Sequence, residues 1–356
     1  MSIIVTGGAG FVGSSLCIRL KQAFPKCKII ALDNLKRRGS ELNLSRLVSA
    51  GIYFQHADVR CSEDLIFKDV DWVIECSAEP SALSGVNGDT GYLINTNLMG
   101  TYNCLEMARK NKAGFLFLST SRVYPYKSFE HLDYHISNTR FNLSPNSEAI
   151  GLTHKGVSEE FSTQGPKTLY GASKLASELL ITEYSQNFDL RTIVNRCGVL
   201  AGPWQMGKVD QGFMALWMAR HLFGGNLSYI NYGGKGLQLR DVLHVQDLVD
   251  LVIIQLSTPE LYKGQTFNVG GGLSGSISLC ELTSICSDIT GNTLEIIPNL
   301  DVRPGDLPWY VTDTSRIEAI SGWRPKKSVN QILEDIYEWL DENRDLLAPI
   351  FSPKVS

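Results

Sequence analysis

Tyr170 and Lys174 are the two side chains whose types and spacing most directly suggest chemistry. They lie four positions apart in a stretch with a helical pattern, so we expect them on one face of a helix. The phenol of a free tyrosine has a pKa of about 10, and a lysine cation beside it lowers that pKa. The phenolate can then take a proton from a hydroxyl group while a hydride leaves the attached carbon. This spacing also arises by chance in helices, so it needs support from elsewhere in the chain.

Hydroxyl groups at the end of a predicted strand give the first support. Residues 114–119 read as a strand, and Ser119, Thr120 and Ser121 stand where it ends. Ligands of open α/β sheets bind at the carboxyl ends of the strands, so these hydroxyls can reach a reacting oxygen. The alternative for Ser119 and Ser121 is capping of the backbone.

A glycine-rich turn gives the second support. Gly7, Gly10 and Gly13 directly follow a predicted strand and open a predicted helix. In a dinucleotide-binding turn the first glycine allows the tight bend, the second lets pyrophosphate approach, and the third lets helix pack on strand. The N–H groups at the start of the helix then face the phosphates.

Asp33 favours NAD as the dinucleotide. It ends the second predicted strand, 20 residues after Gly13, where a carboxylate accepts hydrogen bonds from the ribose hydroxyls and repels the 2′-phosphate of NADP. The basic residues Lys36, Arg37 and Arg38 lie just beyond and leave NADP as an alternative. Asp58 and Val59, after the third strand, are placed to meet the adenine ring, although Asp58 could also be a solvated loop residue.

The elements that must position these residues alternate between strands and helices, which predicts βαβ units and a parallel sheet. The predicted strands are residues 2–5, 28–32, 52–56, 71–76, 114–119, 191–195, 227–230 and 265–269. The predicted helices are residues 11–24, 95–110, 170–187, 211–223, 278–290 and 329–343. We expect an α/β fold: a doubly wound Rossmann sheet over residues 1–195 and a smaller mixed α/β substrate lobe over 196–356, with some elements interleaved. The polar segment 125–168 is long for a connection and predicts a lid over the substrate.

Composition excludes several classes of protein. The formal net charge of −4 offers no basic face for nucleic acid, and we expect no metal site. No apolar run reaches the roughly 18–20 residues of a membrane span, and the first residues lack the pattern of a secretory leader. The eight cysteines are scattered singly, which favours free thiols and a cytoplasmic location over disulfides or zinc.

Taken in order, these motifs resemble the extended short-chain dehydrogenase/reductase family, the nucleotide-sugar epimerases and dehydratases. Within it the chain is most similar to the CDP-paratose (CDP-tyvelose) 2-epimerases. The similar stretches are Asp33-Asn34-Leu35, residues 39–44, Asp210-Gln211-Gly212, Arg240-Asp241-Val242-Leu243-His244, residues 267–271 and residues 302–306, together with the length of the segment between Tyr124 and Tyr170.

The resemblance implies tightly held NAD, a nucleotide-diphosphate sugar as substrate with a CDP-hexose favoured, and a homodimer. It points to Thr120 as the third catalytic residue beside Tyr170 and Lys174. The expected cofactor-binding residues are Gly7, Gly10, Phe11, Val12, Gly13, Asp33, Asn34, Arg37, Asp58, Val59, Ser77, Ala78, Asn97, Ser119, Tyr170 and Lys174. The expected substrate-binding residues are Ser121, Arg122, Arg196, Gln211, Arg240 and Arg303, with Arg240 and Arg303 on the diphosphate.

The departures from the family pattern favour epimerisation. The 4,6-dehydratases of the family carry Asp-Glu where this chain has Ser121-Arg122, so no acid is present to drive loss of water. Decarboxylases of the family place Glu at the position of Arg122. The 2-epimerases place Asn-Lys at the two positions that Ser121 and Arg122 occupy here. The sequence therefore predicts a nucleotide-sugar epimerase acting at carbon 2. The alternatives are a 4-epimerase, a reductase of a related sugar, or a non-catalytic NAD-binding regulator.

Overall fold

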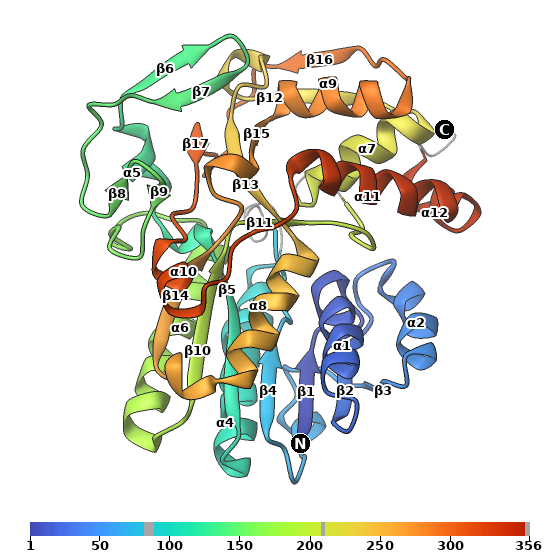
Figure 1. Ribbon diagram of the computed structural model, residues 1–356, viewed down its shortest axis with the longest axis vertical. Coiled ribbons are helices and arrows are strands. Elements are labelled where there is room, and N and C mark those ends of the chain that lie inside the picture. Colours follow the sequence, from blue (N-terminus) through green and yellow to red (C-terminus); the bar gives the residue numbers. More distant parts are fainter. Residues whose placement is uncertain (82–88, 208–210, 353–356) are drawn as a thin grey trace.

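A seven-stranded sheet forms the base of the protein in the computed structural model, which describes residues 1–81, 89–207 and 211–352 (Figure 1). All its neighbouring strands are parallel, and their order is β14-β10-β5-β4-β1-β2-β3. The strands are β1 (Ser2–Thr6), β2 (Lys28–Asp33), β3 (Tyr53–His56), β4 (Trp72–Glu75), β5 (Gly114–Thr120), β10 (Thr192–Cys197) and β14 (Gln265–Val269). The order reverses direction between β1 and β4, and such a switch point is where open α/β sheets bind ligands.

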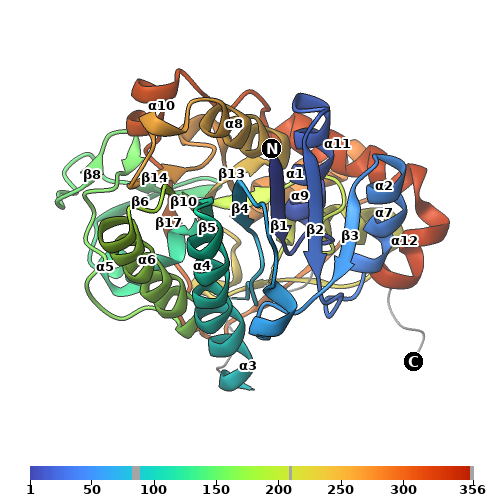
Figure 2. The same cartoon turned by 90° about the horizontal axis from the view of Figure 1, so that it is seen from below.

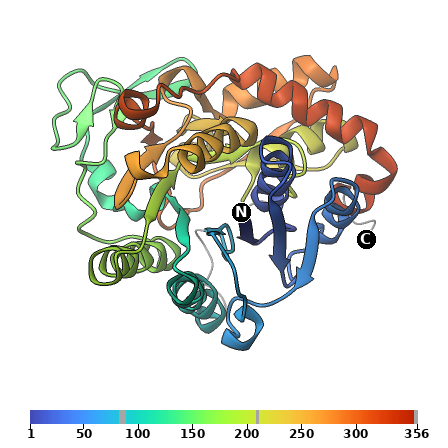
Figure 3. The same ribbon diagram turned by 60° about the horizontal axis from the view of Figure 1, so that its bottom comes forward.

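Helices cover both faces of this sheet (Figures 2 and 3). Alternate residues of each strand point to opposite faces, so Ile3 and Val5 pack into one core and Ile4 into the other. The first face carries α1 (Phe11–Ala23), α8 (Val245–Ser257) and α10 (Ser315–Ser321). The second carries α4 (Gly100–Asn111) and α6 (Leu169–Phe188). The helix α2 (Asn43–Ser49) flanks β3, and α3 (Thr90–Ile94) runs through a π-helical turn into α4.

A second lobe lies above the carboxyl ends of the strands (Figure 1). Its main sheet joins β11 (Val199–Ala201), β13 (Leu239–His244), β15 (Ser276–Ser278) and β17 (Trp309–Tyr310), while β12 (Leu227–Ile230) pairs with β16 (Ile296–Asn299). Its core is made by α7 (Phe213–Phe223), α9 (Leu279–Thr290), α11 (Val329–Glu342) and α12 (Arg344–Phe351). Because β14, α8 and α10 belong to the first lobe, the chain crosses between lobes several times after residue 195.

The segment 125–168 is folded, contrary to the irregular loop that its polar composition suggests. It contains α5 (Tyr126–Glu130) and two antiparallel hairpins, β6 (Tyr134–Ser137) with β7 (Arg140–Leu143) and β8 (Leu152–Thr153) with β9 (Gly156–Val157). Phe129, Val157 and Phe161 pack in one core with β17. These apolar residues are too widely spaced in the sequence to show a periodic pattern, which is why the hairpins were not predicted.

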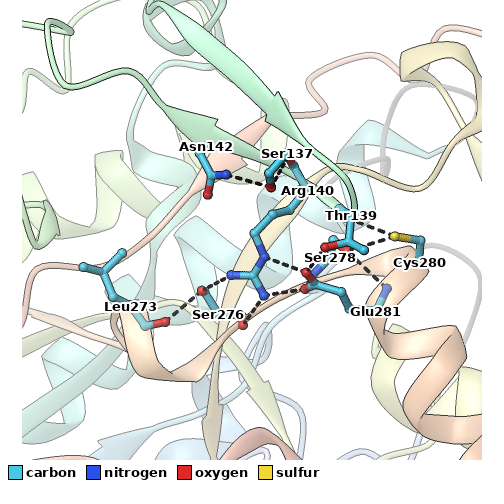
Figure 4. A network of polar contacts seen from close by, with 9 residues as sticks. All are labelled: Ser137, Thr139, Arg140, Asn142, Leu273, Ser276, Ser278, Cys280 and Glu281. Carbon is cyan, nitrogen blue, oxygen red and sulfur yellow. Dashed lines mark hydrogen bonds and ion pairs between the residues drawn. The ribbon is translucent and has the colours of Figure 1, made fainter.

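Arg140 fixes the larger hairpin to the second lobe (Figure 4). Its guanidinium forms an ion pair with Glu281, at the start of α9, and donates to Ser276 Oγ at 3.1 Å. Thr139 Oγ1 also donates to Glu281, at 2.6 Å. The segment is therefore tethered to the second lobe at its tip.

The element boundaries agree with the predicted ones to within two residues at most positions. The helix predicted over 95–110 begins earlier, at Thr90, because Asp89 caps it by accepting from the Tyr92 amide. The helix predicted from residue 211 begins at Phe213, since Gly212 adopts a left-handed conformation. Within the described residues, no helix is both long enough and apolar enough to cross a membrane.

Candidate active site

The glycine turn leads from β1 into α1 and has the shape of a phosphate cradle. Gly7 has φ +63°, and a Cβ there would lie 2.9 Å from the Cys76 carbonyl. A Cβ on Gly13 would lie 2.1 Å from the Gly7 oxygen, so the helix packs directly on the turn. At Gly10 the nearest atom would be 3.1 Å away, and no side chain caps the helix there. The first N–H groups of α1 can therefore meet a pyrophosphate, which fits NAD.

We expect Gly13→Ala to destabilise the protein and to abolish NAD binding, because the added methyl overlaps the Gly7 carbonyl. Such overpacking costs about 1–3 kcal/mol of the free energy of unfolding. Gly10→Ala is the matched comparison: its methyl would come no closer than 3.1 Å to the Gly7 oxygen, a far smaller overlap, but it would fill the space kept for phosphate. It should lower NAD affinity with a stability change below about 1 kcal/mol. Urea unfolding and titration with NAD measure both effects, and full NAD affinity in the Gly13 variant would contradict this account.

Asp33 lies at the end of β2 with its carboxylate against the glycine turn. It accepts from the Ala9 amide at 3.1 Å and the Leu35 amide at 2.8 Å. Burial raises the pKa of Asp33, and these backbone hydrogen bonds oppose the rise. A carboxylate offers about four acceptor sites, so Asp33 can still receive two ribose hydroxyls.

The three basic residues after Asp33 contact other parts of the protein rather than the space beside the Asp33 carboxylate. Arg37 donates to the Met206 carbonyl at 2.7 Å, and Arg38 to the Pro349 carbonyl at 3.0 Å. The ammonium of Lys36 lies over the Tyr92 ring, 4.1 Å from its centroid. These contacts favour NAD over NADP, since a 2′-phosphate would face the Asp33 carboxylate.

The residues expected around adenine are held mainly by one another. Asn34 Nδ2 donates to Asp58 at 3.0 Å, and Arg60 binds the same carboxylate with Nε and Nη2. The Arg60 hydrogen bonds hold the pKa of Asp58 well below its usual range. Val59 is buried against Gly100, where a Cβ would lie 2.8 Å from Val59 Cγ2. Asp58 is thus an ordered anion rather than a solvated loop residue.

Two further predicted cofactor residues lie on the loop after β4, and a third, Asn97, lies in the π-helical turn between α3 and α4. Ala78 lines the cavity described below, and Ser77 Oγ lies 3.0 Å from Thr6 Oγ1. Asn97 has a different role from the one predicted. Its amide accepts from the Glu79 N–H at 2.7 Å and donates to the Glu79 carbonyl and to Ser173 Oγ. Asn97 therefore fixes the loop from beneath, with both amide hydrogens used inside the protein.

Thr120, Tyr170 and Arg122 come together where β5 meets α6. Thr168 caps α6 by accepting from the Gly171 amide at 3.2 Å. A Cβ on Gly171 would lie 2.1 Å from the Arg122 carbonyl, so the first turn of α6 packs on the residues after β5. This contact brings the Tyr170 phenol close to the Thr120 hydroxyl, which lowers the pKa of the phenol.

The pKa of Tyr170 is shifted upward, whereas the sequence predicted a downward shift. Burial raises it to about 12, and the lowering influences come from the Thr120 hydrogen bond and the Arg122 charge. Lys174 is not among the main influences on this pKa in the protein alone, so the lowering by Lys174 stays a prediction. The ammonium of Lys174 lies instead over the Phe117 ring, 3.7 Å from its centroid. Burial lowers the pKa of Lys174, while Glu75 and Glu178 oppose that change.

Arg196 is part of a buried ion pair, and the structure does not place it at the substrate. Its Nη2 lies 2.7 Å from Glu178 Oε2, and its Nη1 donates to Tyr124 Oη at 3.1 Å. Ser119 Oγ donates to the same carboxylate of Glu178. The Arg196 side chain is thus paired with Glu178 of α6. The sequence alone places Arg196 at a strand end, where ligands usually bind.

A cavity of about 450 Å³ extends from the glycine turn into the second lobe. The predicted residues that line it are Phe11, Val12, Ala78, Ser119, Thr120, Ser121, Arg122, Tyr170, Lys174, Gln211, Arg240 and Arg303. Arg196 is absent from this lining, and Asp210 lies outside the described residues. None of the lining residues comes from 125–168. The predicted lid is therefore not found in this structure, because that segment packs on β17 and α9 instead.

The charge of the cavity wall favours an anionic ligand. Five cationic side chains line it: Arg122, Lys174, Arg220, Arg240 and Arg303. Among the described lining residues Asp306 is the one carboxylate, and Arg240 Nη2 binds it at 2.7 Å. An excess of guanidinium groups in an enclosed site suits phosphate oxygens.

Several lining residues escaped the sequence analysis. Gln205, Gln211 and Gln238 each have a buried side-chain oxygen with no hydrogen-bond partner among the described residues, and only Gln211 was predicted. Such acceptors call for donors from a ligand. Arg220 could have been found as a cation within the apolar stretch 213–223. Gln238 and Asn299 gave no comparable signal, since only tertiary contacts with β12 bring them to the cavity: Gln238 Nε2 donates to the Ile230 carbonyl, and Asn299 lies on β16, which pairs with β12.

Comparisons with known proteins match this arrangement. A sequence profile of the NAD dependent epimerase/dehydratase family matches residues 3–270. The CDP-paratose 2-epimerase of Salmonella typhi is 29% identical over 349 residues, covering 95% of this chain and 99% of that protein. The dTDP-glucose 4,6-dehydratase of Salmonella typhimurium is 28% identical over 359 residues, covering 95% and 92%. The Bacillus cereus UDP-glucuronic acid 4-epimerase, solved with UDP-glucuronic acid and NAD, is similar with a TM-score of 0.76 at 25% identity, covering 96% and 99%.

Proposed function

Because the chain belongs to the NAD dependent epimerase/dehydratase family and NAD is its cofactor, we propose that it is a nucleotide-sugar epimerase acting at carbon 2. The favoured substrate is a CDP-hexose. Similarity to the Salmonella typhi CDP-paratose 2-epimerase supports this choice of substrate. A homodimer and a cytoplasmic location remain predictions that accompany it.

The position of Arg122 carries the choice of carbon. Its amide donates to Thr120 Oγ1 at 3.2 Å, its carbonyl packs on Gly171, and its Nη1 donates to the Gly305 carbonyl at 2.8 Å. A guanidinium therefore stands at the catalytic end of the cavity. In a sugar nucleotide the diphosphate is attached to carbon 1, next to carbon 2 and across the ring from carbon 4. A phosphate-binding cation beside Tyr170 thus supports reaction at carbon 2.

Among the described lining residues the one carboxylate is engaged by an arginine, which supports epimerisation over dehydration. Loss of water from a sugar needs a general acid or base besides the group that handles the oxidised hydroxyl. Ser121 and Arg122 supply none, and Asp306 is engaged by Arg240. The intact Tyr170 and Lys174 argue against a non-catalytic regulator.

Each catalytic side chain has a defined task in this scheme. Tyr170 takes the proton of the carbon-2 hydroxyl and later returns it to the same oxygen. Thr120 lines the cavity close to Tyr170 and can orient the sugar oxygen between the two hydroxyls. Arg122, Arg240 and Arg303 hold the diphosphate while the ketone presents its other face. When bound, NAD accepts the hydride from carbon 2 and gives it back, so no net oxidation occurs.

A product assay tests the proposal. The purified protein is incubated in deuterated water with CDP-, UDP-, GDP- and dTDP-hexoses, and the products are followed by NMR. We expect inversion at carbon 2 of a CDP-hexose without added NAD and without deuterium at that carbon, because the hydride is conserved. Inversion at carbon 4 would instead favour the 4-epimerase, for which the similarity to the Bacillus cereus enzyme speaks. NADH formed in amounts equal to product would refute both.

Arg122→Met should weaken binding of CDP about 10- to 100-fold, since a charge-assisted contact to phosphate contributes about 1.5–3 kcal/mol. Cytidine, which has no phosphate, should bind the variant as well as it binds the wild-type protein. Calorimetric titration with both ligands makes the comparison. Equal affinity of the two proteins for CDP would mean that Arg122 does not contact the diphosphate and would remove the argument for carbon 2.

A further inference from the structure

Glu75, the last residue of β4, is a carboxylate that the proposed reaction does not use. Its side chain is fully buried. Oε1 accepts from Thr101 Oγ1 on α4 at 2.8 Å, and Oε2 has no hydrogen-bond partner among the described residues. A buried acid with one unpaired oxygen is costly unless a cation lies nearby.

The register of the sheet places that cation. Glu75 pairs with Phe117 across β4 and β5, and residues paired in this way point to the same face of the sheet. The Phe117 ring carries the Lys174 ammonium at 3.7 Å from its centroid. Glu75 and Lys174 therefore lie in the same buried layer between the sheet and the helices α4 and α6.

The other charges around Lys174 are already matched. Glu178 binds Arg196 and accepts from Ser119. Cys76 and Cys197 also face Lys174, but burial raises the pKa of both thiols, that of Cys197 to about 12, so they are neutral. Cys104 on α4 faces Glu75 and is neutral for the same reason. Glu75 remains as the counter-charge for Lys174, just as Glu178 is the counter-charge for Arg196.

We propose that Glu75 is a positioning residue that holds the Lys174 ammonium ion in its charged form beside Tyr170 and the nicotinamide ribose. The inference rests on the proposed role of the Tyr170–Lys174 pair in hydride transfer. Burial raises the pKa of Glu75 to about 7, and the Lys174 charge opposes the rise. The same pairing favours the charged form of Lys174 against its burial. Loss of the Glu75 charge should therefore lower the pKa of Lys174.

The test measures the ionisation of Lys174 directly. The protein with its bound NAD is labelled with lysine carrying ¹³C at the ε carbon, and the Lys174 signal is assigned by its absence in Lys174→Arg. In Glu75→Gln, which keeps an acceptor for Thr101, we expect the pKa of Lys174 to fall by at least about one unit. The alkaline limb of the kcat profile should move to lower pH by the same amount, with about a 10-fold lower kcat at pH 8. Glu75→Asp should recover part of both.

Glu106→Gln is the matched control, because Glu106 on α4 also accepts from a hydroxyl group, that of Tyr184, but acts on Arg109 rather than Lys174. It should leave the Lys174 signal and the pH profile unchanged. An unchanged Lys174 pKa in Glu75→Gln, or an equal shift in the control, would overturn the proposal.

The proposal can still be tested if the variant does not fold or if no sugar is epimerised. If Glu75→Gln fails to fold, the wild-type Lys174 signal must still show a step as Glu75 ionises, at a pH above the usual pKa of a glutamate, and the absence of any such step counts against the pairing. If no tested sugar is epimerised, the proposed substrate fails, while the NMR titration still decides whether Glu75 controls Lys174.

Discussion

Tyr170→Phe should lower kcat by at least about 10³-fold while NAD stays bound, because the variant keeps the ring and loses the group that moves the proton. The phenol lies in the cavity wall close to the Thr120 hydroxyl. Its pKa of about 12 in the protein alone means that few molecules carry the phenolate at neutral pH. Activity should accordingly rise with pH up to the pKa that Tyr170 has in the loaded enzyme, and this limb should vanish in the variant.

Tyr184→Phe provides the control on the same helix. Tyr184 donates its hydroxyl hydrogen to Glu106 at 2.7 Å and lies outside the cavity lining. Its substitution removes an identical atom from α6 and should leave kcat within about 2-fold. Steady-state kinetics with the epimerised sugar and the absorbance of released NAD give the two readings. Comparable losses in both variants would mean that α6 is perturbed as a whole and that Tyr170 has no specific role.

Arg196→Leu should lower the free energy of unfolding by about 3–5 kcal/mol, because it leaves the buried Glu178 without its partner. Glu178 is 6% exposed and receives three hydrogen bonds from the Arg196 guanidinium. Affinity for CDP should not change, since Arg196 is absent from the described cavity lining. Urea unfolding and calorimetric titration with CDP separate the two effects.

The double variant Glu178→Gln with Arg196→Leu sharpens this test. Removing both charges takes away the uncompensated carboxylate, so the pair of changes should be less destabilising than Arg196→Leu alone. If Arg196 instead bound substrate, as its position at the end of β10 first suggests, the single variant would lose CDP affinity and keep its stability. That outcome would restore the sequence-based prediction.

Local signals in the sequence were sufficient for the parallel sheet and the cofactor site. Gly7, Gly13 and Asp33 act within one βαβ unit, where the constraint on each residue comes from its near neighbours. The strands β12 and β14 agree with the predicted ranges at both ends, because short apolar runs bounded by turns leave little freedom. The family resemblance also rested on such local motifs, and the profile match over residues 3–270 confirms it.

Tyr170 and Lys174 show how much the sequence by itself determined about the site. Their spacing determined that they share a helix face, and the strand end at Thr120 determined where a reacting oxygen would lie. Only the tertiary structure decided which charges surround them: Arg122 stands beside Tyr170, Glu75 lies in the same buried layer as Lys174, and Glu178 binds Arg196. These neighbours come from separate elements whose contacts depend on sheet register and helix packing. Charge interactions act through space, so the order of residues along the chain could not reveal them.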